Sequence, residues 1–454
     1  MDNRIFSISR RKFLQTATTG AIAAPFLLES CKPDDGILQH ACVGIGGMGL
    51  VDLRNFIKHE KVQIVAICDV DSERLKTASE LVPDARTYTD WRKLLKNEAK
   101  NIESINVAVP DHSHFSIAYS AIQLGLNVYC QKPMCHDVAE VRLLTEASIK
   151  KRVITQLGTQ HASSPNDRAG VQLLREGAIG KVQHAYLCSN RPGAIEKYRP
   201  VGPRPKEEYA APEYLDWDLW IGSAPVRSYA PDIYHPMIWR GWQDFGTGWS
   251  GDIGCHIFDA VWKGLGMKSP KSVKAEVQSS WKNSPERRAD TWPQGDHITW
   301  VFPGNELIDG DEFTVEWFDG EMYPPQEIMD LFPHEEYPAE SAMIVGTEGA
   351  LLIAHTGGLA LLPLEKFENY KKPKFQDRNH YHHFVDACLG GEKTESHFAQ
   401  TGPMTEAILL GTVAIRMPDT LLEWDAKKLE FPNNPKANKF LRRTYREGWS
   451  VAEF

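Results

Sequence analysis

A glycine-rich turn is the feature that most limits what this chain can fold into. The segment Gly44-Ile45-Gly46-Gly47-Met48-Gly49 follows an apolar, strand-like run from Leu38 and precedes a helix-like pattern through His59. Strand, glycine turn and helix in this order form the fingerprint of a dinucleotide-binding unit. The glycines allow a tight turn, a close approach of the backbone to a pyrophosphate, and close packing of helix on strand. We therefore predict that a dinucleotide contacts Gly44, Gly46, Gly47, Met48 and Gly49.

An acidic residue follows the second predicted strand. The apolar run 62–68 ends at Asp69, twenty residues after Gly49. An acidic side chain at this spacing accepts hydrogen bonds from the adenosine ribose hydroxyls. Asp69, together with Asp71, would repel a 2′-phosphate, so we predict NAD as the cofactor. Arg74 keeps NADP open as the less favoured alternative.

Strand-like and helix-like segments alternate from the glycine turn to about residue 155. We expect helices near 72–81, 90–97 and 114–124, and strands near 87–88, 104–109 and 127–130. Largely apolar strands such as 105–109 suit a parallel sheet that is buried on both faces. We predict an α/β fold in which residues 37–158 form a Rossmann-type, doubly wound parallel sheet.

From about residue 160 the pattern changes to strand-like runs between long loops. These runs cover 183–189, 272–281, 297–302, 313–318, 342–346 and 350–354, and residues 402–416 are helical in pattern. We predict that residues 159–454 form a second, α+β domain that binds the substrate.

The first residues resemble an export signal. Arg10 and Arg11 precede a modestly apolar stretch, 17–28, which is too short for a membrane-spanning helix. We predict that residues 1–31 are a twin-arginine signal and that the protein is periplasmic. An amphipathic N-terminal helix is the alternative. The segment Leu28-Glu29-Ser30-Cys31 also resembles a lipoprotein cleavage site, and lipidation at Cys31 would tether the protein to the membrane.

Composition excludes several classes of protein. Of the 454 residues, 42% are hydrophobic and 24% are charged, as in globular chains and not in disordered ones. The net charge is −9 and no long basic run follows residue 13, so we exclude nucleic acid as a partner and expect a small molecule. The eight cysteines show no CxxC spacing, and we interpret them mostly as buried core thiols.

Four ordered motifs resemble those of the glucose–fructose oxidoreductase and inositol dehydrogenase family, often called Gfo/Idh/MocA. They are Val107-Ala108-Val109-Pro110-Asp111-His112-Ser113-His114, Val128-Tyr129-Cys130-Gln131-Lys132-Pro133, Gly177-Ala178-Ile179-Gly180-Lys181-Val182, and Gly251-Asp252-Ile253-Gly254-Cys255-His256-Ile257-Phe258-Asp259. The resemblance implies a large, mostly antiparallel sheet in the second domain and a homo-oligomer, dimer or tetramer, formed through that sheet.

The resemblance also implies catalytic roles for Lys132, Asp252 and His256, and cofactor contacts for Pro110, His114 and Lys132. Oxidation of a secondary alcohol needs a base near neutral pKa beside the carbinol, and His256 suits that role. If the segment is helical, Asp252 lies on the same face as His256 and could orient its imidazole. Lys132 would stabilise the developing alkoxide.

Other readings of these residues stay open. Asp252 could be a helix cap and His256 a buried core histidine. A metal site could instead combine Asp252, His256 and Asp259 with histidines of the 380–383 segment, namely His380, His382 and His383, although no zinc spacing occurs and we predict no metal. The family's glutamate before the lysine is Gln131 here, and losing that carboxylate should alter the pKa of Lys132.

An aromatic, donor-rich loop precedes Asp252. It spans 234–242, and we predict that His235, Arg240 and Trp242 contact a sugar or polyol through ring faces and hydrogen bonds. Packing of this loop on the sheet is the alternative. The resulting hypothesis is an exported sugar, glycoside or polyol oxidoreductase with a tightly bound cofactor. The alternatives are an NAD-dependent glycoside hydrolase or lyase with no net redox change, and a binding protein without catalysis.

Overall fold

The computed structural model describes residues 36–192, 200, 202–332 and 336–451. The predicted export signal, with Cys31, lies outside the described residues. Among the described residues, no helix is both long enough and apolar enough to cross a bilayer.

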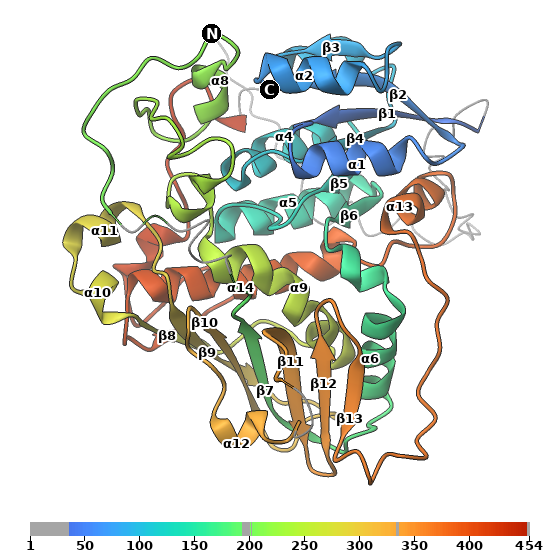
Figure 1. Ribbon diagram of the computed structural model, residues 1–454, viewed down its shortest axis with the longest axis vertical. Coiled ribbons are helices and arrows are strands. Elements are labelled where there is room, and N and C mark those ends of the chain that lie inside the picture. The colour runs from blue at the N-terminus through green and yellow to red at the C-terminus, as the bar shows by residue number, and fades with distance from the viewer. Residues whose placement is uncertain (1–35, 193–199, 201, 333–335, 452–454) are drawn as a thin grey trace, which may run out of the picture. The chain divides into compact units, whose positions relative to one another are not determined.

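Six parallel strands form the first sheet, in the order β3-β2-β1-β4-β5-β6. The strands are β1 (Leu38–Val43), β2 (Val62–Cys68), β3 (Arg86–Tyr88), β4 (Ser104–Val107), β5 (Asn127–Cys130) and β6 (Thr155–Leu157). The helices between them are α1 (Met48–Phe56), α2 (Ser72–Ser79), α3 (Trp91–Glu98), α4 (Asp111–Gln123) and α5 (Val138–Lys151). Strand order reverses between β1 and β4, and doubly wound sheets bind their ligands at such a switch point. The predicted Rossmann-type sheet is confirmed (Figure 1).

Eight strands form the second sheet, in the order β13-β12-β11-β7-β10-β9-β8-β14. They are β7 (Val182–Ser189), β8 (Ser272–Val277), β9 (Asp296–Pro303), β10 (Glu312–Asp319), β11 (Glu340–Gly346), β12 (Ala350–Ala354), β13 (Leu359–Leu362) and β14 (Leu422–Glu423). Only β7 and β10 pair in parallel, so the expected mostly antiparallel sheet is confirmed. Alternate residues of β9 are buried because helices cover one face of the sheet.

Three helices lie against that face: α6 (Pro165–Arg175), α9 (Gly248–Gly264) and α14 (Phe398–Arg416) (Figure 1). The shorter helices are α8 (Trp217–Ile221), α10 (Ser279–Lys282), α11 (Pro285–Asp290), α12 (Gln326–Met329) and α13 (His380–Cys388), with 3-10 turns η1 (Gln160–Ser163), η2 (Ile238–Gly241) and η3 (Ala437–Phe440). Helix α14 also packs on α5, so it contacts both halves of the fold.

Several predicted elements have different bounds in the structure: for example, the helix expected over 402–416 begins at Phe398, and the strand expected over 104–109 ends at Val107. The strand expected over 272–281 ends at Val277, because the chain turns into α10 at Ser279. The helix expected from His114 begins at Asp111, where an acidic residue occupies the first turn directly after Pro110.

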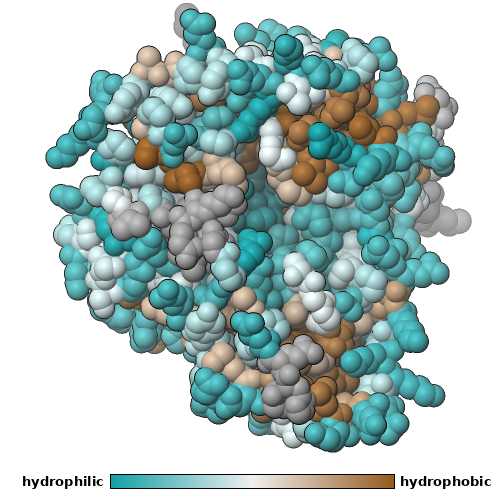
Figure 2. All heavy atoms as spheres, in the orientation of Figure 1, coloured by the Kyte–Doolittle hydropathy of each residue, from teal (hydrophilic) through white to brown (hydrophobic). Residues whose placement is uncertain are grey.

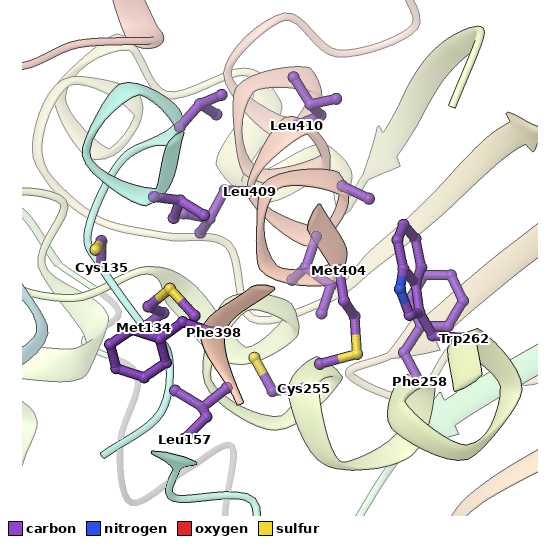
Figure 3. Packing of buried hydrophobic residues seen from close by; sticks show 14 of the residues in the cluster. Met134, Cys135, Leu157, Cys255, Phe258, Trp262, Phe398, Met404, Leu409 and Leu410 are labelled. Atoms are coloured by element: carbon purple, nitrogen blue, oxygen red, sulfur yellow. The ribbon is translucent and has the colours of Figure 1, made fainter. Parts of the chain in front are cut away.

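The core continues between the two sheets. Met134 and Leu157 of the first half meet Cys255 of α9 and Met404 of α14 in one cluster of buried side chains (Figure 3). The seven cysteines among the described residues are all buried and free, as expected for core thiols. Apolar side chains also remain at the surface over α1, where Met48 and Val51 are exposed (Figure 2).

We expect Leu409→Ala to lower the free energy of unfolding by about 2–5 kcal/mol, because Leu409 is fully buried in α14 and its removal leaves a cavity in the shared core. Urea unfolding followed by tryptophan fluorescence measures the change. Leu421→Ala is the matched control: Leu421 is 53% exposed, so its loss should change stability by less than about 0.5 kcal/mol. Equal losses in the two variants would contradict this account of the core.

Candidate functional site

A cavity of about 500 Å³ runs from the glycine turn to α9. Both halves of the fold line it, and it lies at the carboxyl ends of β1, β2 and β4. Of the residues predicted as sites, it is lined by Gly44, Gly46, Gly47, Met48, Asp69, Pro110, Lys132, His235, Arg240, Asp252 and His256.

Backbone geometry in the turn requires glycine at two positions. Gly44 has φ +77°, and a Cβ there would lie 2.3 Å from the Ala108 carbonyl oxygen. A Cβ on Gly49 would lie 2.0 Å from the Gly44 carbonyl oxygen, so Gly49 serves the packing of α1 and does not line the cavity. These glycines thus form the tight turn at the N-terminus of α1, which is where a pyrophosphate binds in folds of this kind.

Asp69 is held at the edge of this turn. Its Oδ2 accepts a hydrogen bond from Ile45 N at 2.9 Å, and its Oδ1 accepts one from Asp71 N at 3.0 Å. Burial raises the pKa of Asp69, and these two backbone donors partly offset that effect. The carboxylate thus lies where a ribose hydroxyl of a bound dinucleotide would donate to it.

Asp71 links the turn region to the second half of the chain. It caps α2, and its Oδ2 lies 3.2 Å from Arg74 Nε and 3.1 Å from His235 Nε2. His235 therefore lies beside Asp71 and lines the cavity, and its contact with a substrate stays a prediction. Arg74 thus contacts this carboxylate through its Nε.

Lys132 and Asp252 meet at the other end of the cavity. Lys132 Nζ donates to Asp252 Oδ1 at 2.6 Å and to the Asp252 carbonyl oxygen at 2.9 Å. Arg240 Nε lies 3.6 Å from the second carboxylate oxygen. Burial would raise the pKa of Asp252, but Lys132 and Arg240 hold that pKa below its ordinary value. Asp252 is consequently an anion that fixes the lysine at the cavity wall.

His256 lies one turn after Asp252 on α9, as expected from the helical spacing. The expected contact between them is wrong, because the Asp252 carboxylate is turned to Lys132 and Arg240. Burial lowers the pKa of His256 well below 6.5, and the charge of Lys132 adds to the effect. The expectation of a base near neutral pKa is therefore wrong for His256: its imidazole is neutral at neutral pH, and a lone pair on one ring nitrogen can accept a proton only as a weak base.

Sequence reasoning missed two further histidines at this end. The ring centroid of His355 lies 4.7 Å from that of His256, and His161 lies 4.3 Å from His355. The chain brings them from η1 and from the end of β12, about a hundred residues to either side of α9, so no local spacing could have revealed them.

Asp111 is another missed group of the cavity, although it stands in the motif 107–114. Its Oδ2 accepts from Thr247 N at 3.1 Å and from Thr247 Oγ1 at 3.0 Å. Burial raises the pKa of Asp111 to about 7, and the nearby charge of Asp252 adds to the rise. The cavity thus contains a carboxyl group that exchanges a proton near neutral pH.

Besides Gly49, two predicted site residues do not line the cavity. The ring nitrogens of His114 lie 2.7 Å and 2.8 Å from the carbonyl oxygens of Pro133 and Val109, so this histidine ties two loops together. Trp242 is 1% exposed and donates to the Ile233 carbonyl oxygen at 2.9 Å. For Trp242 the alternative stated above is therefore correct: this residue packs inside the loop, in a cluster of buried and mostly aromatic side chains.

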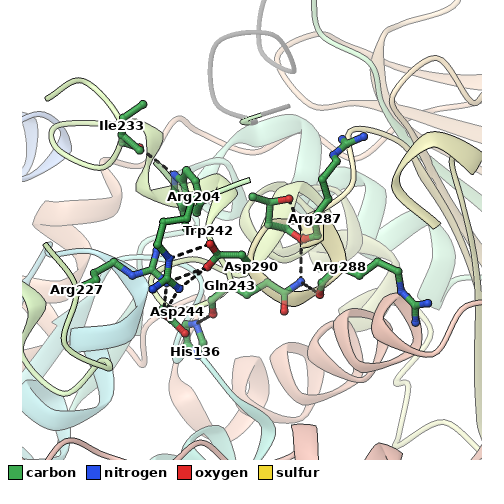
Figure 4. A network of polar contacts seen from close by, with 11 residues as sticks. His136, Arg204, Arg227, Ile233, Trp242, Gln243, Asp244, Arg287, Arg288 and Asp290 are labelled. Carbon is green, nitrogen blue, oxygen red and sulfur yellow. Dashed lines mark hydrogen bonds and ion pairs between the residues drawn. The ribbon is translucent and has the colours of Figure 1, made fainter. Parts of the chain in front are cut away.

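An ion-pair network holds this aromatic loop in place (Figure 4). Arg227, whose side chain is 1% exposed, contacts Asp244 and donates to Asp290 at 3.0 Å. Arg204 donates twice to the same Asp290, at 2.8 and 2.9 Å. Bidentate contacts of this kind fix the geometry of a pair as well as balancing its charge. They therefore hold in place the loop that carries Arg240.

The described residues do not form the metal site that the sequence left as an alternative. Asp259 pairs with Lys263 at 2.6 Å, and the His380 nitrogens lie 2.9 Å from the Leu157 carbonyl oxygen and 2.7 Å from Ser163 Oγ. The His382 ring contacts the ring of His59, and His383 Nε2 lies 3.5 Å from Arg378 Nη1.

Gln131, where the family motif has a glutamate, faces a buried carboxylate. Its Nε2 donates to both oxygens of Asp52 at 2.9 Å. Tyr381 Oη donates to Asp52 at 3.0 Å, and Asn106 Nδ2 donates at 3.3 Å. Burial raises the pKa of Asp52 to about 7, although all three neutral donors oppose the rise. An acidic residue on α1 thus makes a neutral amide necessary at position 131.

Comparison with known proteins agrees with this geometry. The model of the oxidoreductase family's NAD-binding Rossmann fold (GFO_IDH_MocA) matches residues 38–159, and the model of its C-terminal alpha/beta domain matches 172–325. A "Glycosyl hydrolase family 109 protein" of Stenotrophomonas maltophilia is 29% identical over 201 residues, 40% of this chain and 42% of that protein. A "D-apiose dehydrogenase" of Paraburkholderia graminis is 31% identical over 140 residues, 31% of this chain and 37% of that protein. The matched region is thus less than half of either relative.

Solved structures share the fold at lower identity. The WlbA dehydrogenase of Bordetella pertussis, in complex with NADH and UDP-GlcNAcA, has a TM-score of 0.57 and 15% identity over 86% of this chain and 99% of that chain. An aldose-aldose oxidoreductase of Caulobacter crescentus, complexed with glycerol, has a TM-score of 0.57 and 15% identity over 86% of this chain and 100% of that one.

We expect Gln131→Glu to lower the free energy of unfolding at pH 8 by about 3–5 kcal/mol, because it buries a second carboxylate against Asp52. Adding Asp52→Asn should restore most of the loss, since one carboxylate again faces one amide. Chemical unfolding of the two variants beside the wild type measures both effects. The surface control Gln123→Glu should change stability by less than about 0.5 kcal/mol. A double variant no more stable than the single one would refute the pairing.

The same site predicts a pH dependence. The folded protein keeps a proton on Asp52 up to about pH 7, whereas the unfolded chain releases it near pH 4. Folded protein therefore binds more protons in this window, and Asp52 makes stability fall as pH rises, by about 1.4 kcal/mol per pH unit. Above pH 7 the contribution is constant. The difference in unfolding free energy between wild type and Asp52→Asn, measured from pH 4 to 8, should show this slope; a flat difference would contradict it.

Proposed function

Because the chain belongs to the Gfo/Idh/MocA family of NAD-binding oxidoreductases, we propose that it transfers hydride between a hydroxyl-bearing carbon of a sugar, glycoside or polyol and tightly bound NAD. The observation that carries the proposal is that an ion-paired Lys132 and a neutral His256 both line this cavity. Hydroxyl oxidation requires this combination of a cationic donor and a proton acceptor.

The residues present fit a dinucleotide. Gly44, Gly46 and Gly47 would hold the phosphates, and Asp69 would hold the adenosine ribose. Bound NAD supplies the acceptor for the hydride. The protein has to supply the position of the substrate and the path of its proton.

His256 is the proton acceptor in this proposal. Its Nδ1 is buried with no partner among the described residues, which leaves Nε2 to face the cavity. Nε2 takes the hydroxyl proton of the substrate, and Lys132 Nζ donates to the same oxygen as negative charge develops there. Asp252 is a positioning residue, since it accepts a hydrogen bond from Lys132 Nζ and holds this side chain at the cavity.

Polar donors and aromatic rings suit a polyhydroxylated substrate. Arg240 and His355 line the cavity beside Trp239 and Trp249. Ring faces pack against the apolar C–H patches of a sugar, and the donors bind its hydroxyls. The names of relatives that act on D-apiose and inositol support this class of substrate.

A redox-neutral cleavage is the second candidate. Asp111 and His355 provide proton acceptors beyond the one that hydroxyl oxidation needs. Transient oxidation at one carbon acidifies a neighbouring C–H, and a second base could remove that proton while a substituent leaves. The similarity to a glycosyl hydrolase family 109 protein supports this candidate. Release of aglycone from a synthetic glycoside with no net change of NAD would favour it over net oxidation.

We further propose that residues 1–31 direct export by the twin-arginine route, with lipidation at Cys31 as a variant, and that copies associate through the second sheet. Export of the folded protein suits a cofactor that is acquired beforehand and kept. Complete loss of NAD from purified protein on simple dilution would argue against this retention.

Near-ultraviolet absorbance tests the function directly. The mature protein is purified, and a panel of sugars, polyols and glycosides is added. The absorbance of reduced nicotinamide should rise with the substrate. Bound NAD without any rise would point to redox-neutral cleavage, and the absence of NAD from denatured protein would overturn the cofactor assignment.

We expect His256→Ala to lower kcat about 10²–10⁴-fold while NAD remains bound, because the proton acceptor is lost and the glycine turn is untouched. His382→Ala is the control, since His382 lies on α13 outside the cavity, and it should leave kcat unchanged. Because burial keeps the pKa of His256 well below 6.5, wild-type activity should not fall between pH 7 and 6 through protonation of this residue. Unchanged kcat in His256→Ala would remove it from the mechanism.

A further inference from the structure

A second cavity, of about 240 Å³, lies behind the loop that carries Lys132. It is formed where the N-terminus of α5, the C-terminus of α14 and the segment after η3 meet. None of its lining residues belongs to the site described above. Four of them are cations: Arg416, Lys439, Arg442 and Arg443.

The positive charge of this cavity is only partly neutralised. Arg443 donates to Glu140 at 2.7–2.8 Å and lies 3.9 Å from Asp137. Arg416, Lys439 and Arg442 have no ion-pair partner within 4 Å in the part of the chain that the structure describes. An uncompensated cluster of this kind favours an anion.

Arg416 is held in place without a counter-ion. Its guanidinium lies 4.7 Å from the ring centroid of Trp292 and 5.0 Å from that of Phe440. Its Nε is buried and has no hydrogen-bond partner among the described residues. Burial lowers the pKa of Arg416 to about 10, and the distant Asp244 and Asp137 only partly offset this. The aromatic rings fix the cation, but they leave its hydrogen bonds unmade.

His136 lacks a hydrogen-bond donor at one ring nitrogen, whereas Arg416 lacks an acceptor for its Nε. It lines the cavity and is 9% exposed, and its Nε2 donates to the Gln243 carbonyl oxygen at 2.9 Å (Figure 4). Since Nε2 carries the hydrogen, the neutral ring presents a lone pair at Nδ1. This Nδ1 is buried and has no partner in the described structure. A ligand that contacts this ring nitrogen has to donate a hydrogen bond to it, while its other atoms accept from the arginines.

We propose that this cavity binds phosphate, free or as a small phosphate monoester, in its monoprotonated-ester or dihydrogen form. Such an anion carries acceptor oxygens for Arg416 and Arg442 and one hydroxyl that donates to His136 Nδ1. Sulfate and carboxylates at neutral pH lack that donor, so they satisfy only the cations. Asp137 also lines the cavity, but its carboxylate is engaged: it caps α5 by accepting from Glu140 N at 3.0 Å and lies 3.9 Å from Arg443.

Isothermal titration of inorganic phosphate at pH 6, at constant ionic strength, tests the proposal. The protein is saturated with NAD so that its glycine turn is not available to phosphate. We expect saturable binding that is tighter than binding of sulfate, and a matching rise in Tm. Glycerol 3-phosphate in competition shows whether the cavity also admits an ester; exclusion of the ester would assign free phosphate.

Variants locate the binding. Arg416→Met keeps the side-chain volume and removes an uncompensated charge, so the Tm without phosphate should not fall, whereas phosphate affinity should fall about ten-fold or more. Lys439→Ala should also weaken binding. Lys436→Ala, an exposed lysine of the same segment that does not line the cavity, should leave it unchanged. The proposal is overturned if phosphate does not bind the NAD-saturated protein, if sulfate binds equally well, or if Arg416→Met and Lys439→Ala bind phosphate like the wild type.

Discussion

The contact between Lys132 and Asp252 is the interaction on which the rest of the site depends. Lys132 follows the last residues of β5 in the first sheet, and Asp252 stands on α9 over the second. Their side chains are 15% and 8% exposed, so the pair is largely removed from water. Removing one partner of a buried pair leaves an uncompensated charge, which costs about 3–5 kcal/mol. The same two charges therefore join the halves of the fold and define the end of the cavity where chemistry is proposed.

The features that sequence predicted well are local ones. The glycine turn and Asp69 depend on a strand, a turn and a helix that are contiguous in the chain, so their spacing is fixed by backbone geometry alone. The face shared by Asp252 and His256 follows in the same way from the period of a helix. For these residues, the motif and the structure carry the same information.

The features that sequence missed depend on long-range contacts. Asp52 and Gln131 are 79 residues apart in the sequence. Only the packing of α1 against the end of β5 brings them together and so explains why an amide faces this carboxylate. His355 reaches His256 from a different element, and no periodicity announces it. The prediction for Trp242 was wrong for a related reason. An aromatic residue in a polar loop is equally consistent with a ligand contact and with burial, and here Trp242 is buried in a loop that the long-range ion pairs of Arg227 hold in place.

The arginine beside the glycine turn has a consequence for kinetics. A Cβ on Gly46 would lie 2.1 Å from Arg74 Nη1, so the guanidinium covers the middle of the turn. Arg74 is held by Asp71, and Asp71 is held in turn by His235 from the other half of the chain. A dinucleotide that rests on this turn therefore has to displace the guanidinium. Cofactor binding and the contacts that join Arg74 to Asp71 and Asp71 to His235 are then linked, so anything that orders the loop of His235 also changes the rate of cofactor exchange.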